Sequence, residues 1–312
     1  MVAEARVAVC SRSFSANPVL RAEILERYQQ VTFNDRGERL SGDRLAEFLS
    51  GHEKVIVGLE VIDGNLLDRV PELEVVSKYG VGLDSIDLAA LAGRGVRLGW
   101  TPGVNSRAVA ELVLAVAISL LREVPRLSAE VRAGEWRQVT GGCLTGRTVG
   151  IVGWGSVGQD LASLLVPFHC EILVNDVRRV AGSTGSPMVE QVDLESLLRR
   201  SDVVTLHVPL TPETTGLLGA ADLATMKDTA VLVNAARGGI VDEPALAEAL
   251  RHGWLSGAAL DVFETEPPIG SDLLALLNFL PTPHIGGSTH ESYEAMGRAA
   301  IAGLDDNFIP EA

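Results

Sequence analysis

Cysteine and aromatic residues are scarce in this chain, and each scarcity excludes a class of protein. Its three cysteines, Cys10, Cys143 and Cys170, show no CxxC spacing. An odd number of widely scattered cysteines disfavours both a disulfide framework and a zinc site, so we expect reduced thiols and no metal. Aromatic residues make up 4% of the chain, whereas 32 residues are glycine. That balance is typical of an α/β protein with many tight turns and not of a β-sandwich.

Basic residues and long apolar runs are also lacking. Lysine and arginine number 26 against 41 acidic residues, and the formal net charge of −15 disfavours nucleic acid as a partner. One local basic pocket would still suffice for an anionic substrate. The longest apolar run, Leu112–Leu121, includes Ser119 and falls far short of the roughly 20 residues that span a bilayer. No secretion signal is visible at the start, so we expect a cytoplasmic protein with no membrane partner.

The rest of the sequence has a regular alternation of elements. Its 312 residues suffice for two domains of about 150 residues each. Short apolar segments alternate with helical patterns, which predicts βαβ units and parallel sheets. We expect an exposed loop at 180–187. The expected strands are 6–10, 54–58, 74–80, 95–99, 147–153, 171–176, 202–208, 229–235 and 255–262, and the expected helices include 18–29, 156–168 and 289–307.

The segment 105–122 predicts a helix of a different kind. It follows a Pro–Gly pair and opens with Asn105 and Ser106, both good N-cap residues. Its side chains are apolar nearly all round, and such a helix is buried between layers, domains or subunits. We therefore expect it to be a hinge or an interface element.

Two strand–glycine–helix turns, "YGVGLDS" and "VGWGSVG", compete as the site of a dinucleotide. Only the second has the full G-x-G-x-x-G pattern, as Gly153, Gly155 and Gly158, because Ser85 takes the third position of the first. Asp176 then ends the next strand, close to the spacing of about 20 residues expected for an acid that binds ribose. The sequence therefore predicts a dinucleotide at the second turn.

The glycines and the acid divide the expected binding between them. The three glycines permit a tight turn, close approach of a pyrophosphate, and close helix–strand packing. Backbone N–H groups at Ser156 and Val157, in the first turn of the helix, would face the phosphates. A carboxylate at Asp176 accepts ribose hydroxyls and repels a 2′-phosphate, which favours NAD. Arg178 and Arg179 lie close by and leave NADP open.

Three charged residues of the last third follow predicted strands of the same sheet. Arg237 lies in "ARGG", Glu266 in "ETEPP" and His284 in "TPHIGG". Each alone has an ordinary structural explanation, but ligands bind at the carboxyl edge of open α/β sheets, so we expect the three to converge. His207, together with Pro209 and Ala235, is expected to line the cofactor crevice at that edge.

These segments resemble one family over almost the whole chain. The motifs "SKYGVGLDSID", "TPGVNSRAVAEL", "LTGRTVGIVGWGSVG", "HVPLTPETTGLL", "NAARGGIVDE", "LDVFETEPP" and "TPHIGGST" are similar to those of the D-isomer-specific 2-hydroxyacid dehydrogenases, the phosphoglycerate dehydrogenase-like branch in particular. The resemblance implies two Rossmann-like, doubly wound parallel-sheet domains. An NAD-binding domain, 100–285, would be inserted into a discontinuous substrate-binding domain formed by 1–99 and 286–312.

The resemblance also implies roles for the three charged residues. Arg237 would bind the carboxylate and carbonyl of the substrate, His284 would be the proton donor and acceptor, and Glu266 would pair with that histidine. These residue types suit the reduction of a 2-keto acid, because histidine exchanges protons near neutral pH and arginine matches a carboxylate. The activity implied is NAD(H)-dependent interconversion of a 2-keto acid and a D-2-hydroxy acid.

Further contacts are implied for the cofactor and the substrate. Asp261 would reach the nicotinamide carboxamide, and the backbone amides of Val81 and Gly82 would hold the substrate carboxylate. Phosphoglycerate-type members carry cations for a phosphate, whereas this chain has "GLE" after the strand "VIV". Lys78 and Arg107 are candidate replacements, so 3-phosphoglycerate and similar dianionic acids stay open as substrates.

Other functions and an assembly are also implied by relatives. A homodimer formed through helix 105–122 is expected, with Trp136 near the partner's active site or in the interface. Some relatives are NAD-sensing corepressors or scaffolds without turnover, and others oxidise phosphite or formate. Glutamate at position 266 favours hydroxyacid chemistry, because formate dehydrogenases carry glutamine there.

Overall fold

The computed structural model describes residues 3–180 and 189–311, and it divides them into two compact units. The first unit combines 1–105 with 289–312, and the second is 106–288. The predicted domain boundaries, 99/100 and 285/286, fall a few residues before these. Of the predicted loop 180–187, all but Val180 lies outside the described residues.

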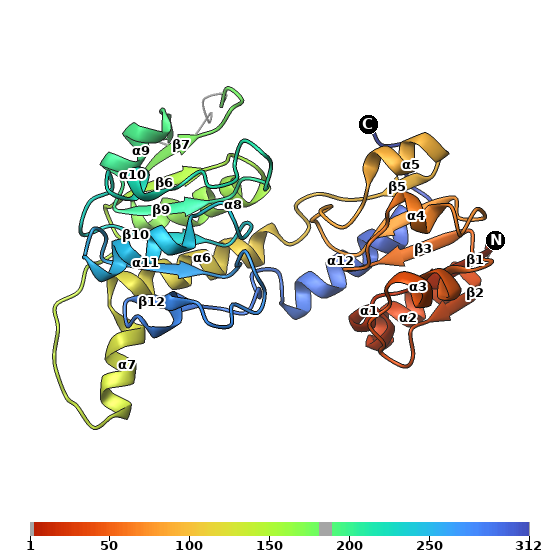
Figure 1. Cartoon of the computed structure of the whole chain (residues 1–312), viewed down its shortest axis with the longest axis horizontal. Helices are drawn as coiled ribbons and strands as arrows, with labels where there is room; N and C mark the ends of the chain where they lie inside the picture. Colours follow the sequence, from red (N-terminus) through yellow and green to blue (C-terminus); the bar gives the residue numbers. More distant parts are fainter. Residues whose placement is uncertain (1–2, 181–188, 312) are drawn as a thin grey trace. The chain divides into compact units, whose positions relative to one another are not determined.

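The first unit is a five-stranded parallel sheet in the order β2-β1-β3-β4-β5 (Figure 1). One core lies between the sheet and α3, α4 and α5, and another between the sheet and α1, α2 and α12. The strands are β1 (Ala3–Val9), β2 (Tyr28–Phe33), β3 (Lys54–Val57), β4 (Val75–Lys78) and β5 (Arg97–Gly99). The helices are α1 (Arg12–Ala16), α2 (Pro18–Leu25), α3 (Gly42–Leu49), α4 (Gly64–Leu67), α5 (Leu88–Arg94) and α12 (His290–Gly303).

The predicted helix 18–29 is too long. Helix α2 ends at Leu25, and Tyr28 begins strand β2, which the sequence did not reveal. The strand lies at the edge of the sheet, and only its first residue is fully buried. Because an edge strand covers little of the core, its apolar residues are too sparse for a clear alternation.

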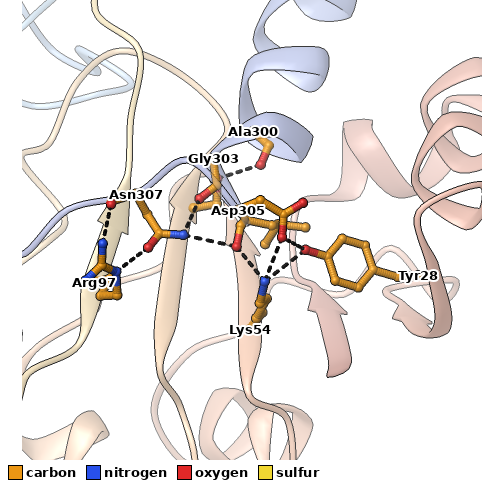
Figure 2. Close-up of polar contacts among 9 residues, drawn as sticks. Tyr28, Lys54, Arg97, Ala300, Gly303, Asp305 and Asn307 are labelled. Carbon is orange, nitrogen blue, oxygen red and sulfur yellow. Dashed lines mark hydrogen bonds and ion pairs between the residues drawn. The ribbon is translucent and has the colours of Figure 1, made fainter. Parts of the chain in front are cut away.

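The end of the chain returns to the first unit and is held there by polar contacts (Figure 2). The Lys54 ammonium donates to Leu304 O at 2.6 Å, and to Asp305 Oδ1 and the Tyr28 hydroxyl at 2.9 Å each. Arg97 of β5 donates to both the side chain and the carbonyl of Asn307. The last turn of α12 leaves carbonyls without helical partners, and Lys54 satisfies one of them.

The second unit is a seven-stranded parallel sheet in the order β12-β11-β10-β9-β6-β7-β8. From β6 the chain adds strands toward one edge, through β7 to β8, and then returns to add β9 to β12 toward the other edge. This reversal of strand order between β6 and β9 is the doubly wound pattern. Helices α6 and α8 cover one face, and α9, α10 and α11 cover the other. The strands are β6 (Thr148–Val152), β7 (Glu171–Asn175), β8 (Val189–Gln191), β9 (Val203–Leu206), β10 (Val231–Asn234), β11 (Gly257–Leu260) and β12 (Phe279–Pro281). The helices are α6 (Ser106–Leu121), α7 (Val124–Arg132), α8 (Ser156–Leu165), α9 (Leu194–Arg200), α10 (Ala220–Leu223) and α11 (Glu243–Arg251).

Helix α6 was expected to be buried, as a hinge or an interface element, and its buried residues pack within the second unit. Residues such as Val113 and Leu120 are buried in the core of the second unit, against the sheet and α8. This packing accounts for the buried residues of α6, and a role of the helix in an interface between subunits stays a prediction. Among the described helices, α6 included, none has the length and hydropathy needed to cross a membrane.

Candidate active site

The four strands β9 to β12 end level with one another. Strand pairing places Leu206 beside Asn234, Asn234 beside Leu260, and Leu260 beside Pro281. The residues that follow these strands therefore share one edge of the seven-stranded sheet. His207, Ala235 and Asp261 follow directly, and Arg237 and His284 lie slightly further on.

The glycine turn joins β6 to α8 at the point where the strand order of the sheet reverses. Gly153 has φ +100°, and a β-carbon there would lie 2.6 Å from the carbonyl oxygen of His207. A β-carbon on Gly158 would lie 2.3 Å from the carbonyl oxygen of Gly153. A β-carbon on Gly155 would meet no atom of the described residues within 4 Å. Packing thus explains Gly153 and Gly158, whereas Gly155 leaves open space suited to a pyrophosphate.

The first turn of α8 is also suited to phosphates. Gly155 is its N-cap residue and offers no side-chain cap, so the N–H groups of this turn are not capped from that residue. Ser156 is exposed and Val157 is half-buried at the start of the helix. The residues present therefore fit a dinucleotide bound through backbone N–H groups.

Asp176 follows β7, and its side chain contacts the backbone of the glycine turn. Its Oδ2 accepts from Trp154 N at 2.7 Å, and its Oδ1 accepts from Arg178 N at 2.8 Å and Arg178 Nε at 3.3 Å. Burial opposes ionisation, but these hydrogen bonds outweigh it and lower the pKa of Asp176. The group therefore presents a stable negative charge beside the glycine turn.

His207, Pro209 and Ala235 lie at the carboxyl edge, as predicted from their positions after strands. His207 is half-buried, its Nε2 lies 2.9 Å from Thr205 Oγ1, and burial lowers its pKa to about 4. It is therefore a neutral ring at pH 7. Pro209 is exposed and Ala235 is half-buried.

Arg237 lies in a turn that Asn234 organises. The Asn234 side chain donates to Arg237 O at 2.8 Å and accepts from Ala236 N at 3.0 Å. Arg237 is half-buried, and its guanidinium donates to Ala236 O at 2.7 Å. A β-carbon on the next residue, Gly238, would lie 2.0 Å from the carbonyl carbon of Phe263. This close backbone contact brings the arginine turn against the segment that carries Glu266.

Glu266 and His284 form a direct pair. His284 Nδ1 lies 2.9 Å from Glu266 Oε2 and 3.1 Å from Oε1, and Phe263 N donates to Oε1 at 3.1 Å. A carboxylate only accepts hydrogen bonds, so Nδ1 carries the proton of this bond and Nε2 is the ring nitrogen not engaged by Glu266. The side chains are 52% and 40% exposed for His284 and Glu266, respectively, which leaves the ring accessible.

Asp261, in contrast, is almost fully buried, with 4% of its surface exposed. Its carboxylate accepts hydrogen bonds from the loop after β12, which carries His284. Two contributors to the site, Asn234 and Thr282, were missed from the sequence. The signal for Asn234 is a buried amide that ends the otherwise apolar strand "VLVN". Thr282 gave no signal beyond its place beside a proline.

The predicted substrate contacts Lys78, Val81 and Gly82 belong to the five-stranded unit. Lys78 is 6% exposed, and its ammonium donates to Gly58 O. Val81 and Gly82 are half-buried after β4, and Val81 O accepts from Trp100 Nε1 at 3.0 Å.

Two other charged residues are relevant to whether a substrate phosphate could bind, and both have partners within the protein. Glu60 Oε2 accepts from Gly58 N at 2.7 Å, so a carboxylate folds over the end of β3. Arg107, in the seven-stranded unit, pairs with Asp160 at 2.6 Å.

Comparison with known proteins gives consistent matches. The model of the family described as "D-isomer specific 2-hydroxyacid dehydrogenase, NAD binding domain" matches residues 114–286. A glyoxylate reductase of Thermococcus litoralis is 39% identical over 252 residues, covering 78% of this chain and 76% of that protein. A D-3-phosphoglycerate dehydrogenase of Methanocaldococcus jannaschii is 40% identical over 238 residues, covering 75% of this chain but 45% of that longer protein. The crystal structure of D-lactate dehydrogenase from Aquifex aeolicus, complexed with NAD and lactic acid, has a TM-score of 0.83 and 26% identity, covering 95% of this chain and 93% of that one.

Proposed function

Since the chain belongs to the D-isomer-specific 2-hydroxyacid dehydrogenase family and is an NAD-dependent oxidoreductase, we propose that Arg237, Glu266 and His284 are its catalytic residues. The observation that carries this proposal is the hydrogen bond of 2.9 Å between His284 Nδ1 and Glu266 Oε2. It fixes the ring and leaves Nε2 to exchange a proton with the substrate oxygen.

The reaction needs a proton and a hydride delivered to one carbonyl group. NADH supplies the hydride to C2 of the keto acid when it is bound. His284 Nε2 donates the proton to the carbonyl oxygen, and Glu266 stabilises the imidazolium before transfer. Arg237 is permanently charged and binds the substrate carboxylate and the polarised carbonyl. In the direction of oxidation, the same ring accepts the hydroxyl proton.

The cofactor site follows from the turn that joins β6 to α8. Open space at Gly155 and the N–H groups of Ser156 and Val157 support binding of the pyrophosphate there. The ionised Asp176 supports ribose binding and selection of NAD. His207, Pro209 and Ala235 are proposed to line the cofactor further along the edge.

We further propose a short 2-keto acid, such as glyoxylate or hydroxypyruvate, in preference to a phosphorylated one. Glu60 places a carboxylate at the end of β3, and the Lys78 ammonium is engaged by Gly58 O. Arg107 is held by Asp160. Near the end of β3 the charges of Glu60 and Lys78 therefore do not favour a distal phosphate, and in the second unit the charge of Arg107 is balanced by Asp160. Backbone amides at Val81 and Gly82 are proposed to hold the substrate carboxylate.

A test of the function is loss of NADH absorbance with a panel of keto acids. Glyoxylate, hydroxypyruvate, pyruvate and phosphohydroxypyruvate would be compared in wild type, His284→Ala and the control His290→Ala. Turnover that His284→Ala abolishes and the control retains would support the proposal. Equal turnover in both variants would contradict the role of His284, and phosphohydroxypyruvate as the best substrate would contradict the substrate class.

A homodimer is the proposed assembly, formed through α6, α7 and the extended segment that follows α7. Helix α7 has no buried residue, and Trp136 is 83% exposed in the extended segment after it. Val124 and Val131 of α7 are about half exposed, at 50% and 52%. An apolar surface of this kind is suited to a second copy. Sedimentation of wild type beside Trp136→Arg tests this: a wild-type monomer at micromolar concentration would contradict the dimer.

A further inference from the structure

The loop that carries His284 has few backbone hydrogen bonds of its own. Within it, His284 N donates to Thr282 O at 3.0 Å and Ser288 N donates to Ile285 O at 2.8 Å. His284 also has φ +54°, a left-handed conformation that is uncommon for a residue with a β-carbon. Something outside the loop must therefore hold it in place.

The Asp261 carboxylate supplies the missing contacts. Its Oδ1 accepts from Thr282 Oγ1 at 2.6 Å and from Ile285 N at 2.8 Å, and its Oδ2 accepts from Gly286 N at 2.7 Å. The three donors come from both sides of His284. A carboxylate has about four acceptor positions, so these three bonds use most of them.

Packing around Gly286 restricts the same carboxylate. A β-carbon on Gly286 would lie 3.0 Å from Asp261 Oδ2 and 3.5 Å from Val109 Cγ2. Asp261 itself is 4% exposed. The carboxylate therefore has little freedom to turn toward another partner, and charge-assisted hydrogen bonds of this length are strong.

We propose that Asp261 is a positioning residue for His284, and that holding this loop, more than contacting the nicotinamide, is its main contribution to turnover. The proposal rests on the proposed role of His284 as the proton donor. Asp261 directly follows β11, the strand that pairs with β12, so it ties the His284 loop to the sheet. Thr282 acts with it through the bond at 2.6 Å.

Paired variants separate this role from a cofactor contact. Asp261→Asn keeps the shape but sets an amide N–H against a backbone donor. Thr282→Val removes one donor and leaves the carboxylate intact, whereas Thr282→Ser keeps the hydroxyl. The measurements are kcat and KM for the keto acid, the NADH Kd by fluorescence titration, the primary isotope effect with 4-deuterated NADH, and the melting temperature.

The expected result is a loss of kcat of about 10- to 100-fold in Asp261→Asn and Thr282→Val, because a small displacement of a proton donor has that effect. The NADH Kd should stay within about twofold of wild type, because the residues proposed to hold the pyrophosphate and the ribose are unchanged. The isotope effect on kcat should rise as the chemical step becomes limiting. Thr282→Ser should keep wild-type kcat, which a loss of packing alone would not predict.

Other outcomes overturn the proposal. A weaker NADH Kd in Asp261→Asn, with normal kcat in Thr282→Val, would make Asp261 a cofactor contact. If Asp261→Asn fails to fold, the test rests on Thr282→Val, and a normal kcat in that variant would contradict the positioning role of Asp261. Retention of turnover in His284→Ala would instead contradict the catalytic role of His284, which is a separate failure.

Discussion

A β-carbon on Gly158 would lie 2.3 Å from the carbonyl oxygen of Gly153, so the first and last glycines of the turn are in mutual backbone contact. No side chain larger than hydrogen fits this position without movement of the turn. The middle glycine has no such neighbour. The same motif therefore combines two glycines that backbone packing requires with one that the packing of the described residues does not require.

Alanine substitutions should separate these requirements. Gly158→Ala forces overlap with backbone and should lower the free energy of unfolding by about 1–3 kcal/mol. Gly155 has φ −80° and open space around a β-carbon, so the stability of Gly155→Ala should match wild type. Its NADH Kd should rise at least about tenfold, because the added methyl group occupies space proposed for the pyrophosphate. Urea denaturation and NADH titration would be measured on both. A stable Gly155→Ala with unchanged NADH affinity would contradict a pyrophosphate at this turn.

The pair formed by Glu266 and His284 predicts a loss of turnover on neutralising the acid. Glu266→Gln keeps the shape but removes the charge that stabilises the imidazolium, so kcat/KM should fall by about 10- to 1000-fold. Glu264→Gln is the control, because that side chain is exposed in the same segment. Similar kcat/KM values for the two variants would show that Glu266 has no special part in the reaction.

His207 predicts a stability change in mild acid. Burial lowers its pKa from 6.5 to about 4, so the unfolded chain takes up a proton below pH 6.5 while the folded chain does not until pH 4. Stability from this residue is therefore intact above pH 6.5 and decreases as pH falls toward 4. Urea midpoints at pH 7 and pH 5 should differ more in wild type than in His207→Gln. Equal losses in the two proteins would mean that His207 does not titrate in this way.

The parallel strands were predictable because they are buried on both faces. Segments such as "VGIV" in β6 and "VLVN" in β10 are short apolar runs bounded by turns, which is typical of a parallel sheet. The edge strands β2, β8 and β12 were not named in advance. An edge strand buries fewer residues, so the sequence carries less of the pattern on which such a prediction depends.

The site was predictable where a strand end coincides with a charged residue. Arg237 and Glu266 could be grouped from sequence because they follow predicted strands of one sheet, and His284 could be added because its motif was expected at the same edge. The part played by Asn234 could not, because it depends on the conformation of the turn in which it bonds Ala236 N and Arg237 O. Thr282 could not be grouped either, because its bond to Asp261 joins two loops and becomes visible only when the register of β11 and β12 is known.

The contacts at Lys54 predict how firmly the chain end is attached. Lys54→Met removes three hydrogen bonds, to Leu304 O, Asp305 and the Tyr28 hydroxyl, and leaves these groups without their donor. The free energy of unfolding should fall by about 1–3 kcal/mol. Arg36→Met is the control, because that side chain is 85% exposed. Equal urea midpoints for the two variants would show that the contacts add little.

The arrangement of Asp176 and Arg178 predicts a latent site for a 2′-phosphate. The carboxylate holds the guanidinium through the contact of 3.3 Å and also repels a phosphate. Asp176→Asn removes the charge but keeps an acceptor for Trp154 N, so the fold should persist while Arg178 becomes available.

The preference for NADH over NADPH, measured as the ratio of kcat/KM values, should fall by at least about tenfold in Asp176→Asn. Adding Arg178→Gln should reverse the gain for NADPH, because the phosphate then loses its cation. An unchanged ratio in the single variant would mean that selection of NAD does not depend on Asp176. A gain that survives in the double variant would point to Arg179, the next basic residue, as the group that receives the phosphate.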